Sequence, residues 1–389
     1  MVVRFSKAAL KAGAVLLFFT LAVLSSPAER ESLAEIYRSG KVRLVPELVI
    51  EGRSLPEGIL FVGPVDISVD PSGRIFVLDL QDHNIKIFDS SGKFQKALGR
   101  KGQGPGDFNM PLSFAFVKDR LAVWDMGNRR LCVLTPEGEF VKAREISGLS
   151  GRPNRIKALP GGDLVVETEK MFFDDPNKPQ EVALEILTSE LTPKRVICSH
   201  PVWRNKFMRL EQGLVNLPQP FAPDLHWDVS PDGKIVAGFS ETYEIGVHDA
   251  DGKVLAKFTH PHDPVKVTAE DKKGFFDGMT HTTGEGTSGQ GAPDFVVENT
   301  KFPAEKPAFN DLLVDSEGNI WAHPFDKDQD LEKRCFDVFA PAGEFISRVE
   351  ILGESARYPY RAKIIDGCLW TIEMDDEGFF KIVKNKITR

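Results

Sequence analysis

The sequence predicts an all-β fold, a six-bladed β-propeller, on three observations. Short runs of alternating polar and apolar residues recur along the chain between glycine turns, as half-buried strands do. These runs form units that resemble small antiparallel sheets, which cannot bury both faces without neighbours of their own kind. Six such units follow one another, and a closed ring of blades satisfies them all. The expected blades lie near residues 64–108, 111–145, 152–196, 225–258, 308–350 and 359–389.

The first unit shows the strand-and-turn pattern most clearly. Asp70-Pro71-Ser72-Gly73 places proline and glycine where a β-turn accepts them. Arg74–Leu78 is a β-branched and aromatic run, and Asn84–Phe88 alternates before a second glycine turn. Most of the other units repeat this order of strand, turn and strand.

An additional strand is expected near the N-terminus. Val42–Ile50 reads as a strand, and Pro46 within it confines that strand to an edge position. The sixth unit ends almost at the C-terminus with a short last strand. We therefore expect 42–50 to complete the sixth blade and close the ring, so that the propeller spans 42–389 without exposed sheet edges.

The first 28 residues predict a secretory signal peptide. Basic residues precede an apolar core at 12–24, and small residues lead to a cleavage site after Ala28. The core is too short to span a bilayer comfortably. The mature protein is expected to be exported, to the periplasm or the extracellular space, without stable insertion in a membrane. The charged segment 29–41 is expected to hold one short helix.

The charge balance and the cysteines exclude several classes of partner and site. The formal net charge is −8 with no basic stripe, which argues against nucleic acid and anionic membranes as partners. The wide cysteine spacing fits no zinc motif, and free buried thiols are favoured, although export leaves three disulfide pairings open. A closed ring hides its edges, so a monomer is expected. The cysteines are Cys132, Cys198, Cys335 and Cys368.

At this point the chain resembles a known family. The segments VLDLQDHNIKIFDSSGKF and VWDMGNRRLCVLTPEGEF, with GRKGQGPGDF between them, are similar to NHL-type propeller repeats of exported bacterial proteins. The resemblance implies the propeller fold and a scaffold for binding, and only some members of the family are enzymes.

One residue of each inner strand is a candidate for ligand binding. Aligning these strands on the turns that follow them gives a polar residue in every blade, with apolar residues one and three positions later. Such a ring would lie at the mouth of the central channel, where converging polar groups form a natural ligand site. The alternative is structural, because Arg361 would neighbour both Asp66 and Asp311 and could pair with them. The six candidates are Asp66, Ser113, Arg155, His226, Asp311 and Arg361.

Two long insertions interrupt the repeats, at 197–224 and 258–307. Both join the last strand of one blade to the first strand of the next, so they are expected on the face where the inner strands begin. Surface loops on a rigid scaffold are common binding sites. The aromatic residues of the first insertion favour a packed lid, and a short helix is expected around Thr268–Met279.

The predicted function is recognition of a protein or small ligand on this face, without catalysis and without a cofactor. Propellers that resemble gluconolactonases hold a divalent metal with oxygen ligands, which the two arginines of the ring would repel. Amidating lyases of similar fold use several histidines for zinc, and the ring offers only His226. No catalytic residue and no metal ligand is therefore assigned. A metal-dependent hydrolase or lyase at the channel mouth, lactonase-like or amidating-lyase-like, stays open as the alternative, as does a structural module of a surface assembly.

Three weaker motifs are interpreted as ordinary loops without a ligand. Gly99–Gly106 is glycine-rich but lacks the ending of a phosphate loop, so an inter-blade loop is expected. Asp326, Asp328 and Asp330 suggest a calcium loop, but Leu331 stands where that loop needs glycine, which favours a solvated acidic loop. His260-Pro261-His262 is interpreted as an exposed loop.

Overall fold

The computed structural model describes residues 31–146, 148–173, 175, 178–210, 213–282, 288–325, 334–352 and 361–389. The predicted signal peptide and the aspartates at 326–330 lie outside this part of the chain. The chain divides into the units Met1–Ser32 and Leu33–Arg389, and the fold below is that of the second unit.

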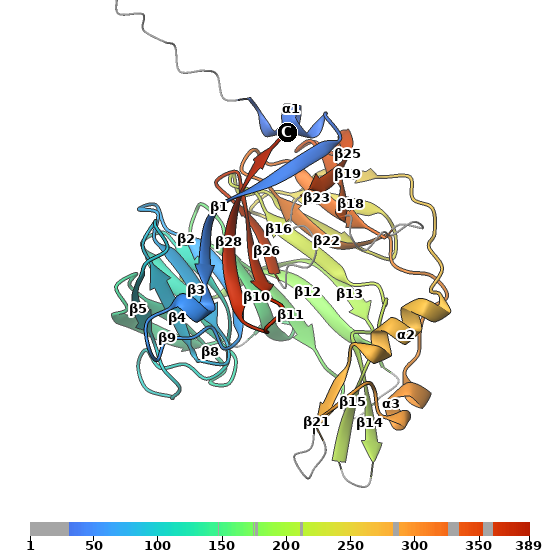
Figure 1. Ribbon diagram of the computed structural model, residues 1–389, viewed down its shortest axis with the longest axis horizontal. Helices are drawn as coiled ribbons and strands as arrows, with labels where there is room; N and C mark the ends of the chain where they lie inside the picture. Colours follow the sequence, from blue (N-terminus) through green and yellow to red (C-terminus); the bar gives the residue numbers. More distant parts are fainter. Residues whose placement is uncertain are drawn as a thin grey trace, which may run out of the picture. The chain divides into compact units, whose positions relative to one another are not determined.

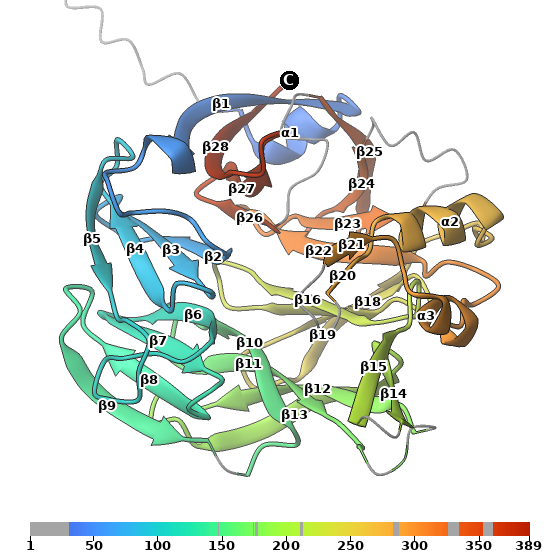
Figure 2. The same ribbon diagram turned by 60° about the horizontal axis from the view of Figure 1, so that its bottom comes forward.

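The second unit is a ring of twisted antiparallel sheets (Figures 1 and 2). The first four blades are separate four-stranded sheets whose strands follow the chain order from the inside outward. The first blade consists of β2 (Pro64–Val69), β3 (Ile75–Asp79), β4 (Asn84–Phe88) and β5 (Phe94–Leu98). The second consists of β6 (Pro111–Val117), β7 (Arg120–Asp125), β8 (Arg130–Leu134) and β9 (Phe140–Glu145). The third consists of β10 (Arg152–Ala158), β11 (Leu164–Lys170), β12 (Gln180–Leu187) and β13 (Pro193–Val202). The fourth consists of β16 (Leu225–Val229), β17 (Ile235–Phe239), β18 (Glu244–His248) and β19 (Val254–Thr259).

The fifth and sixth blades share one continuous eight-stranded sheet. The N-terminal strand β1 (Lys41–Glu51) joins them, because it pairs in antiparallel fashion with β28 over most of its length and in parallel with the end of β25. The predicted closure of the ring by this strand is therefore confirmed. The fifth blade consists of β22 (Phe309–Val314), β23 (Ile320–Pro324), β24 (Arg334–Phe339) and β25 (Phe345–Leu352). The sixth adds β26 (Arg361–Ile365), β27 (Cys368–Met374) and β28 (Phe380–Thr388) to β1.

The hydrophobic core lies between the blades. Six clusters of buried apolar side chains occur in the described residues, and each lies between two neighbouring blades. The cluster around Trp370 and Val77 packs the sixth blade against the first, so the ring is closed by packing as well as by β1. Helix α1 (Leu33–Tyr37) covers the junction of the fifth and sixth blades, where the Tyr37 hydroxyl donates to Asp315 at 2.8 Å.

The two insertions form additional elements beside the ring, as Figure 1 shows. The first insertion starts later than the sequence pattern suggests, because β13 extends to Val202 to pair with the long β12. It then forms the hairpin β14 (Asn205–Leu210) and β15 (Gly213–Pro218). The second contains α2 (Ala269–Asp277), capped by Thr268, then β20 (Thr280–Thr282), β21 (Ser288–Gln290) and α3 (Asp294–Asn299). A 3-10 turn, η1 (Gly52–Ser54), follows β1.

The glycine-rich segment Gly99–Gly106 packs between the first two blades, as an inter-blade loop. Arg130 donates to the main-chain carbonyl oxygens of Gln103 and Gly104, at 3.1 and 2.9 Å. Gly99 has φ of +84° beside the buried Phe108 ring, which leaves no room for a side chain. The loop thus directs carbonyl oxygens at an arginine, the reverse of a phosphate loop that presents N–H groups.

All four cysteines are free, and Cys132 and Cys368 are buried in strands. In the described part of the chain, no helix has the length and apolar character that crossing a membrane requires.

Candidate functional site

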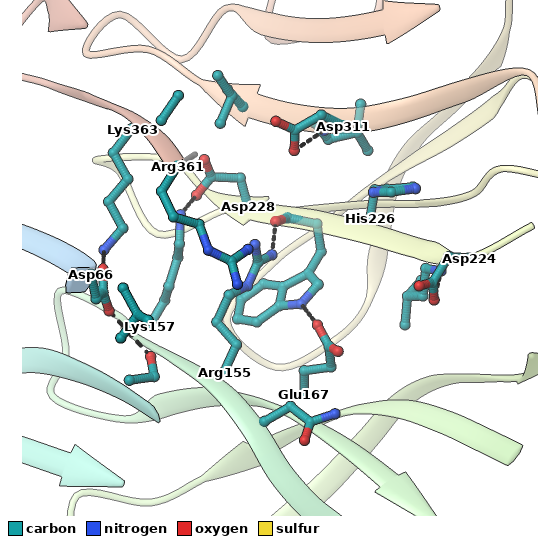
Figure 3. Close-up of a pocket in the computed structure, with 18 of the residues that line it drawn as sticks. Asp66, Arg155, Lys157, Glu167, Asp224, His226, Asp228, Asp311, Arg361 and Lys363 are labelled. Atoms are coloured by element: carbon teal, nitrogen blue, oxygen red, sulfur yellow. Dashed lines mark hydrogen bonds and ion pairs between the residues drawn. The ribbon is translucent and has the colours of Figure 1, made fainter. Parts of the chain in front are cut away.

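A cavity of about 650 Å³ lies at the centre of the ring, and its walls include the inner strand of every blade. All six residues that the sequence analysis selected line it: Asp66, Ser113, Arg155, His226, Asp311 and Arg361. Figure 3 shows the labelled members converging from several strands. Their assembly follows from the shared turn alignment of the inner strands, and their role in ligand binding stays a prediction.

Ionisable side chains beyond these six also line the cavity. The cations among the described lining residues are Arg155, Lys157, Arg204, Arg334, Arg361 and Lys363. The carboxylates are Asp66, Glu167, Asp224, Asp228 and Asp311. Lys157, Asp228 and Lys363 each lie two residues after one of the six predicted residues, on the same face of the strand. Extending the period-two alignment by one step would therefore have predicted them. Arg204, Glu167 and Arg334 come from an insertion and from second and third strands, which the inner-strand alignment does not cover.

Asp66 is a buried link between three blades. Its carboxylate accepts the main-chain N–H of Ile67 at 2.9 Å and of Phe114 at 3.3 Å, and it forms an ion pair with Lys363. Lys363 also donates to the Ile67 carbonyl oxygen at 3.0 Å. The expected structural pairing at this position therefore exists, but the cation is Lys363 and not Arg361, because Lys363 lies one pleat further along β26.

Asp228 repeats this arrangement in the fourth blade. Its carboxylate accepts the N–H of Val229 at 2.6 Å and of Val314 at 3.1 Å, and it forms an ion pair with Lys157 from the third blade. Burial lowers the pKa of Lys157 below its ordinary value, and Arg155 and Lys363 add to this while Asp228 opposes it. The two Lys–Asp pairs hold neighbouring blades together at the wall of the cavity.

Ser113 belongs to the same structural network. Its hydroxyl donates to Asp66 at 3.3 Å and accepts the N–H of Ile156 at 3.1 Å, which ties the first three inner strands together. Ser113 is only 2% exposed. Of the six predicted residues, Asp66 and Ser113 thus have their polar atoms engaged by the protein itself.

Arg155 is different, because part of its guanidinium has no partner. The group stacks on the Trp227 ring with Cζ at 4.3 Å from the ring centre, and Nη2 donates to the Trp227 carbonyl oxygen. Its Nε is buried and makes no hydrogen bond. Trp227 is fixed in turn by Glu167, which accepts the indole N–H at 2.7 Å. Arg155 is therefore held in place with donor capacity to spare.

The first insertion contributes Arg204 to the cavity wall. Its guanidinium contacts Glu167 at 2.9 Å and Asp224 at 2.7 Å. Burial acts to raise the pKa of Glu167, but Arg204 and Arg155 outweigh it and hold that pKa below its ordinary value. The same carboxylates outweigh desolvation at Arg204 and raise its pKa. Glu167 and Arg204 are thus fixed in their charged forms.

His226 and Asp311 lie on adjacent inner strands. Burial lowers the pKa of His226, and Arg155 contributes in the same direction while Asp311 and Asp224 oppose it, so the imidazole is neutral at pH 7. Asp311 accepts only the N–H of the following Leu312, at 2.9 Å, and forms no ion pair with a described residue. Arg361, from β26, is exposed and lines the cavity on the same side of the ring.

The fifth blade adds two further groups, His323 and Arg334. Burial lowers the pKa of His323 to about 3, with Arg334 contributing, and its Nδ1 is buried without a hydrogen bond. Burial also lowers the pKa of Arg334, whose Nε is buried and unpartnered in the described part of the chain. The Phe336 ring packs against both groups, with its centre 5.0 Å from that of the His323 ring and 5.2 Å from Arg334 Cζ.

The described side chains contain no group of three or more His, Cys, Asp or Glu residues arranged to hold a metal ion. His260, from the predicted exposed loop, instead stacks on Phe345 and lies 4.0 Å from Asp337 at the outer side of the fourth and fifth blades. What the cavity offers chemically is a set of fixed hydrogen-bond donors, chiefly guanidinium groups, with carboxylate and amide groups nearby.

Comparison with known proteins supports the fold. A family model described as a 6-bladed beta-propeller matches residues 58–147, which span the first two blades. No curated protein sequence matches the chain.

Solved structures with little sequence identity share the fold over nearly the whole chain. A presumptive exported protein from Bacteroides fragilis is 11% identical with a TM-score of 0.52, covering 92% of this chain and 98% of its own. A DUF4221 family member from Bacteroides vulgatus is 12% identical with a TM-score of 0.52, covering 90% and 99%. Virginiamycin B lyase from Staphylococcus aureus is 13% identical, with coverage of 89% and 99% and a lower TM-score of 0.42. The resemblance to six-bladed propellers of exported bacterial proteins is confirmed at the level of the fold, and the chain is a six-bladed β-propeller protein.

Proposed function

We propose that this protein is exported and binds a small polar ligand in the central cavity, without transforming it. The ligand would enter on the face that carries the insertions 197–224 and 258–307. The observation that carries the proposal is the cavity itself, whose walls combine inner strands of all six blades with a side chain, Arg204, from the first insertion.

The size and lining of the cavity favour a small molecule over a protein surface. Its volume of about 650 Å³ falls within the range of ordinary ligand sites. Its lining is mainly polar, which favours a hydrophilic ligand, because burying these groups against an apolar ligand would leave them without hydrogen bonds. A protein partner that contacts the insertions is the competing outcome of the test below.

The carboxylates that face the cavity are mostly committed to cations of the protein. Asp66 and Asp228 are paired with lysines, and Glu167 and Asp224 with Arg204. Groups fixed in this way suit recognition, since preorganised charges reduce the ordering cost of binding.

The test compares the mature protein with the variant Asn310→Trp, which fills the cavity. Asn310 lines the cavity and makes no hydrogen bond through its side chain in the described residues, so the variant should fold. We expect at least one compound of a small-molecule panel to raise the melting temperature of the wild type and not of the variant. Equal responses, or capture of a protein partner that the variant still binds, would contradict the cavity as the site.

A lactone and ester panel, run with metal analysis of the purified protein, addresses the catalytic alternative. Turnover that depends on a stoichiometric metal and disappears in Asn310→Trp would replace the binding proposal by an enzymatic one. Export is checked separately by sequencing the N-terminus of the mature protein, which is expected to start at Glu29.

A further inference from the structure

Resting on the proposed function, we propose that the ligand is a hydroxyl-bearing carboxylate, the class that includes sugar acids. Arg155 binds the carboxylate, and the corner formed by Asn310 and Asp311 receives hydroxyl groups. The proposal rests on the charges of the cavity, the partners of Arg155 and the free acceptor at Asp311.

The charges of the described lining residues add up to one excess positive charge. Six cations face five carboxylates, and both lining histidines are neutral because burial lowers their pKa values. Three cations, Lys363, Lys157 and Arg204, are engaged by four of the carboxylates. A ligand with a single negative charge would balance this sum over the described residues.

Arg155 is the cation best placed to receive that charge. Among the described residues it forms no ion pair within 4.0 Å, and its one hydrogen bond goes to a neutral carbonyl oxygen. The guanidinium has five N–H donors, and the buried Nε–H has no acceptor among the described residues. An unpartnered buried donor is costly, and a ligand oxygen at this place would remove that cost.

The cations Arg155, Lys157 and Lys363 repel one another when no anion lies between them. Burial is the main cause that lowers the pKa values of Lys157 and His226, and Arg155 adds to both shifts while Lys363 adds to that of Lys157. An anion bound beside Arg155 would relieve this repulsion. Part of the favourable free energy of binding would thus come from weaker repulsion among the protein's own cations.

The geometry favours a carboxylate over a phosphate. The Trp227 ring covers one face of the guanidinium, which leaves its planar edge for a bidentate pair with a planar carboxylate. A phosphate monoester carries about 1.5 to 2 negative charges at pH 7. That exceeds the single positive charge of the cavity, and five carboxylates line the same walls.

The hydroxyl requirement comes from the opposite wall. Asp311 accepts one main-chain N–H on Oδ1 and no other described donor, and Asn310 beside it makes no side-chain hydrogen bond to a described residue. A carboxylate accepts hydrogen bonds and donates none when ionised, so it selects a ligand that brings donors. Hydroxyl groups supply donors without adding charge.

The experiment is isothermal titration of the mature protein with three matched sets of probes. The acids are D-glucuronate, D-galacturonate and D-gluconate, the neutral set is D-glucose and D-galactose, and D-glucose 6-phosphate represents phosphates. We expect at least one acid to bind at least tenfold more tightly than its neutral counterpart and than the phosphate. In Arg155→Met that acid should bind about 10- to 100-fold more weakly, as for loss of a charge-assisted hydrogen bond. Neutral sugars should bind as they do to the wild type.

Two further variants keep the result interpretable. Arg155→Lys retains the charge without the planar fork and should show an intermediate loss of affinity for the acid. Arg144→Met removes an exposed arginine of the edge strand β9 that does not line the cavity and donates to the Glu190 carbonyl oxygen at 2.8 Å, and it should leave the affinity for every probe unchanged. Melting temperatures establish that each variant is folded.

The possible failures can be told apart. Equal affinity for acids and neutral sugars, or acid binding that ignores Arg155→Met, overturns this inference and leaves the binding function standing. Preference for the phosphate overturns the carboxylate assignment. If no acid binds while another compound binds and Asn310→Trp abolishes it, the ligand class is wrong and the cavity function holds. If nothing binds in the cavity, both proposals fail.

Discussion

The first two blades and the third and fifth blades differ in whether the protein itself supplies partners for their arginine and lysine donors. In the first blade Lys86 is fully buried against Asp79, and in the second Arg130 reaches Asp125 and the loop carbonyl oxygens. In the third and fifth blades Arg155 and Arg334 have a buried Nε without a hydrogen bond. The first region uses its charges to hold turns and loops. The second keeps donors available at the cavity, which points to a ligand as their partner.

The loops differ in the same sense. A compact glycine-rich loop joins the first two blades and is filled by Phe108 and Arg130. The connections before and after the fourth blade are the two long insertions, and the first of them delivers Arg204 to the cavity. The long connections of the ring therefore flank the fourth blade, and one of them supplies a side chain to the proposed binding cavity.

The largest effect is expected from Asp79→Ala in the structural region. Asp79 accepts the N–H groups of Val62 and Gly63 at 2.8 and 2.9 Å and pairs with Lys86 at 3.1 Å. Removing the carboxylate takes from the buried ammonium its one fully buried acidic partner and leaves two main-chain N–H groups without an acceptor, so unfolding should become easier by about 3–5 kcal/mol. Urea unfolding measures this. Asp82→Ala is the control, since Asp82 contacts the same lysine from a more exposed position; an equal loss in both variants would contradict the assignment.

A somewhat smaller loss is expected from Gly99→Ala. Alanine there would overlap the buried Phe108 ring and adopt a positive φ, which together should cost about 2–4 kcal/mol. Gly291→Ala is a matched control, because its φ is also positive, at +88°, but nothing lies within 4 Å of the added Cβ. Its loss should be about 1 kcal/mol. If the two variants melted at the same temperature, the close contact with Phe108 would not be the reason that position 99 requires glycine.

The residues of the cavity show how much of the site could be predicted from the sequence. Period-two alternation and glycine turns fix the blades and bring Asp66, Ser113, Arg155, His226, Asp311 and Arg361 to one cavity. The same period implies Lys157, Asp228 and Lys363, but choosing which of two polar positions pairs across blades requires the stagger between adjacent sheets. Arg204 could not be predicted, because its position depends on how an insertion folds back on the ring.

The two Lys–Asp pairs allow a comparison across the cavity. Lys363→Met removes an ion pair and a hydrogen bond to Ile67, and should cost about 2 kcal/mol. Lys157→Met should cost less, because it also relieves the repulsion from Arg155 and Lys363. Chemical unfolding of both variants checks the order. Equal losses would mean that repulsion between these cations does not lower the free energy of unfolding.

The smallest effect concerns the pH dependence contributed by His323 at the cavity wall. Burial lowers its pKa to about 3 in the folded protein, against about 6.5 in the unfolded chain. Between these values the unfolded state binds the additional proton, so stability falls as the pH drops below 6.5. By pH 5.5 the loss from this one group is at most about 1.4 kcal/mol. Unfolding free energies of the wild type and His323→Gln at pH 7.5 and 5.5 measure it as the difference between the two slopes. Parallel slopes would show that His323 is protonated as easily in the folded chain, and hence that this wall of the cavity is wetter than its burial indicates.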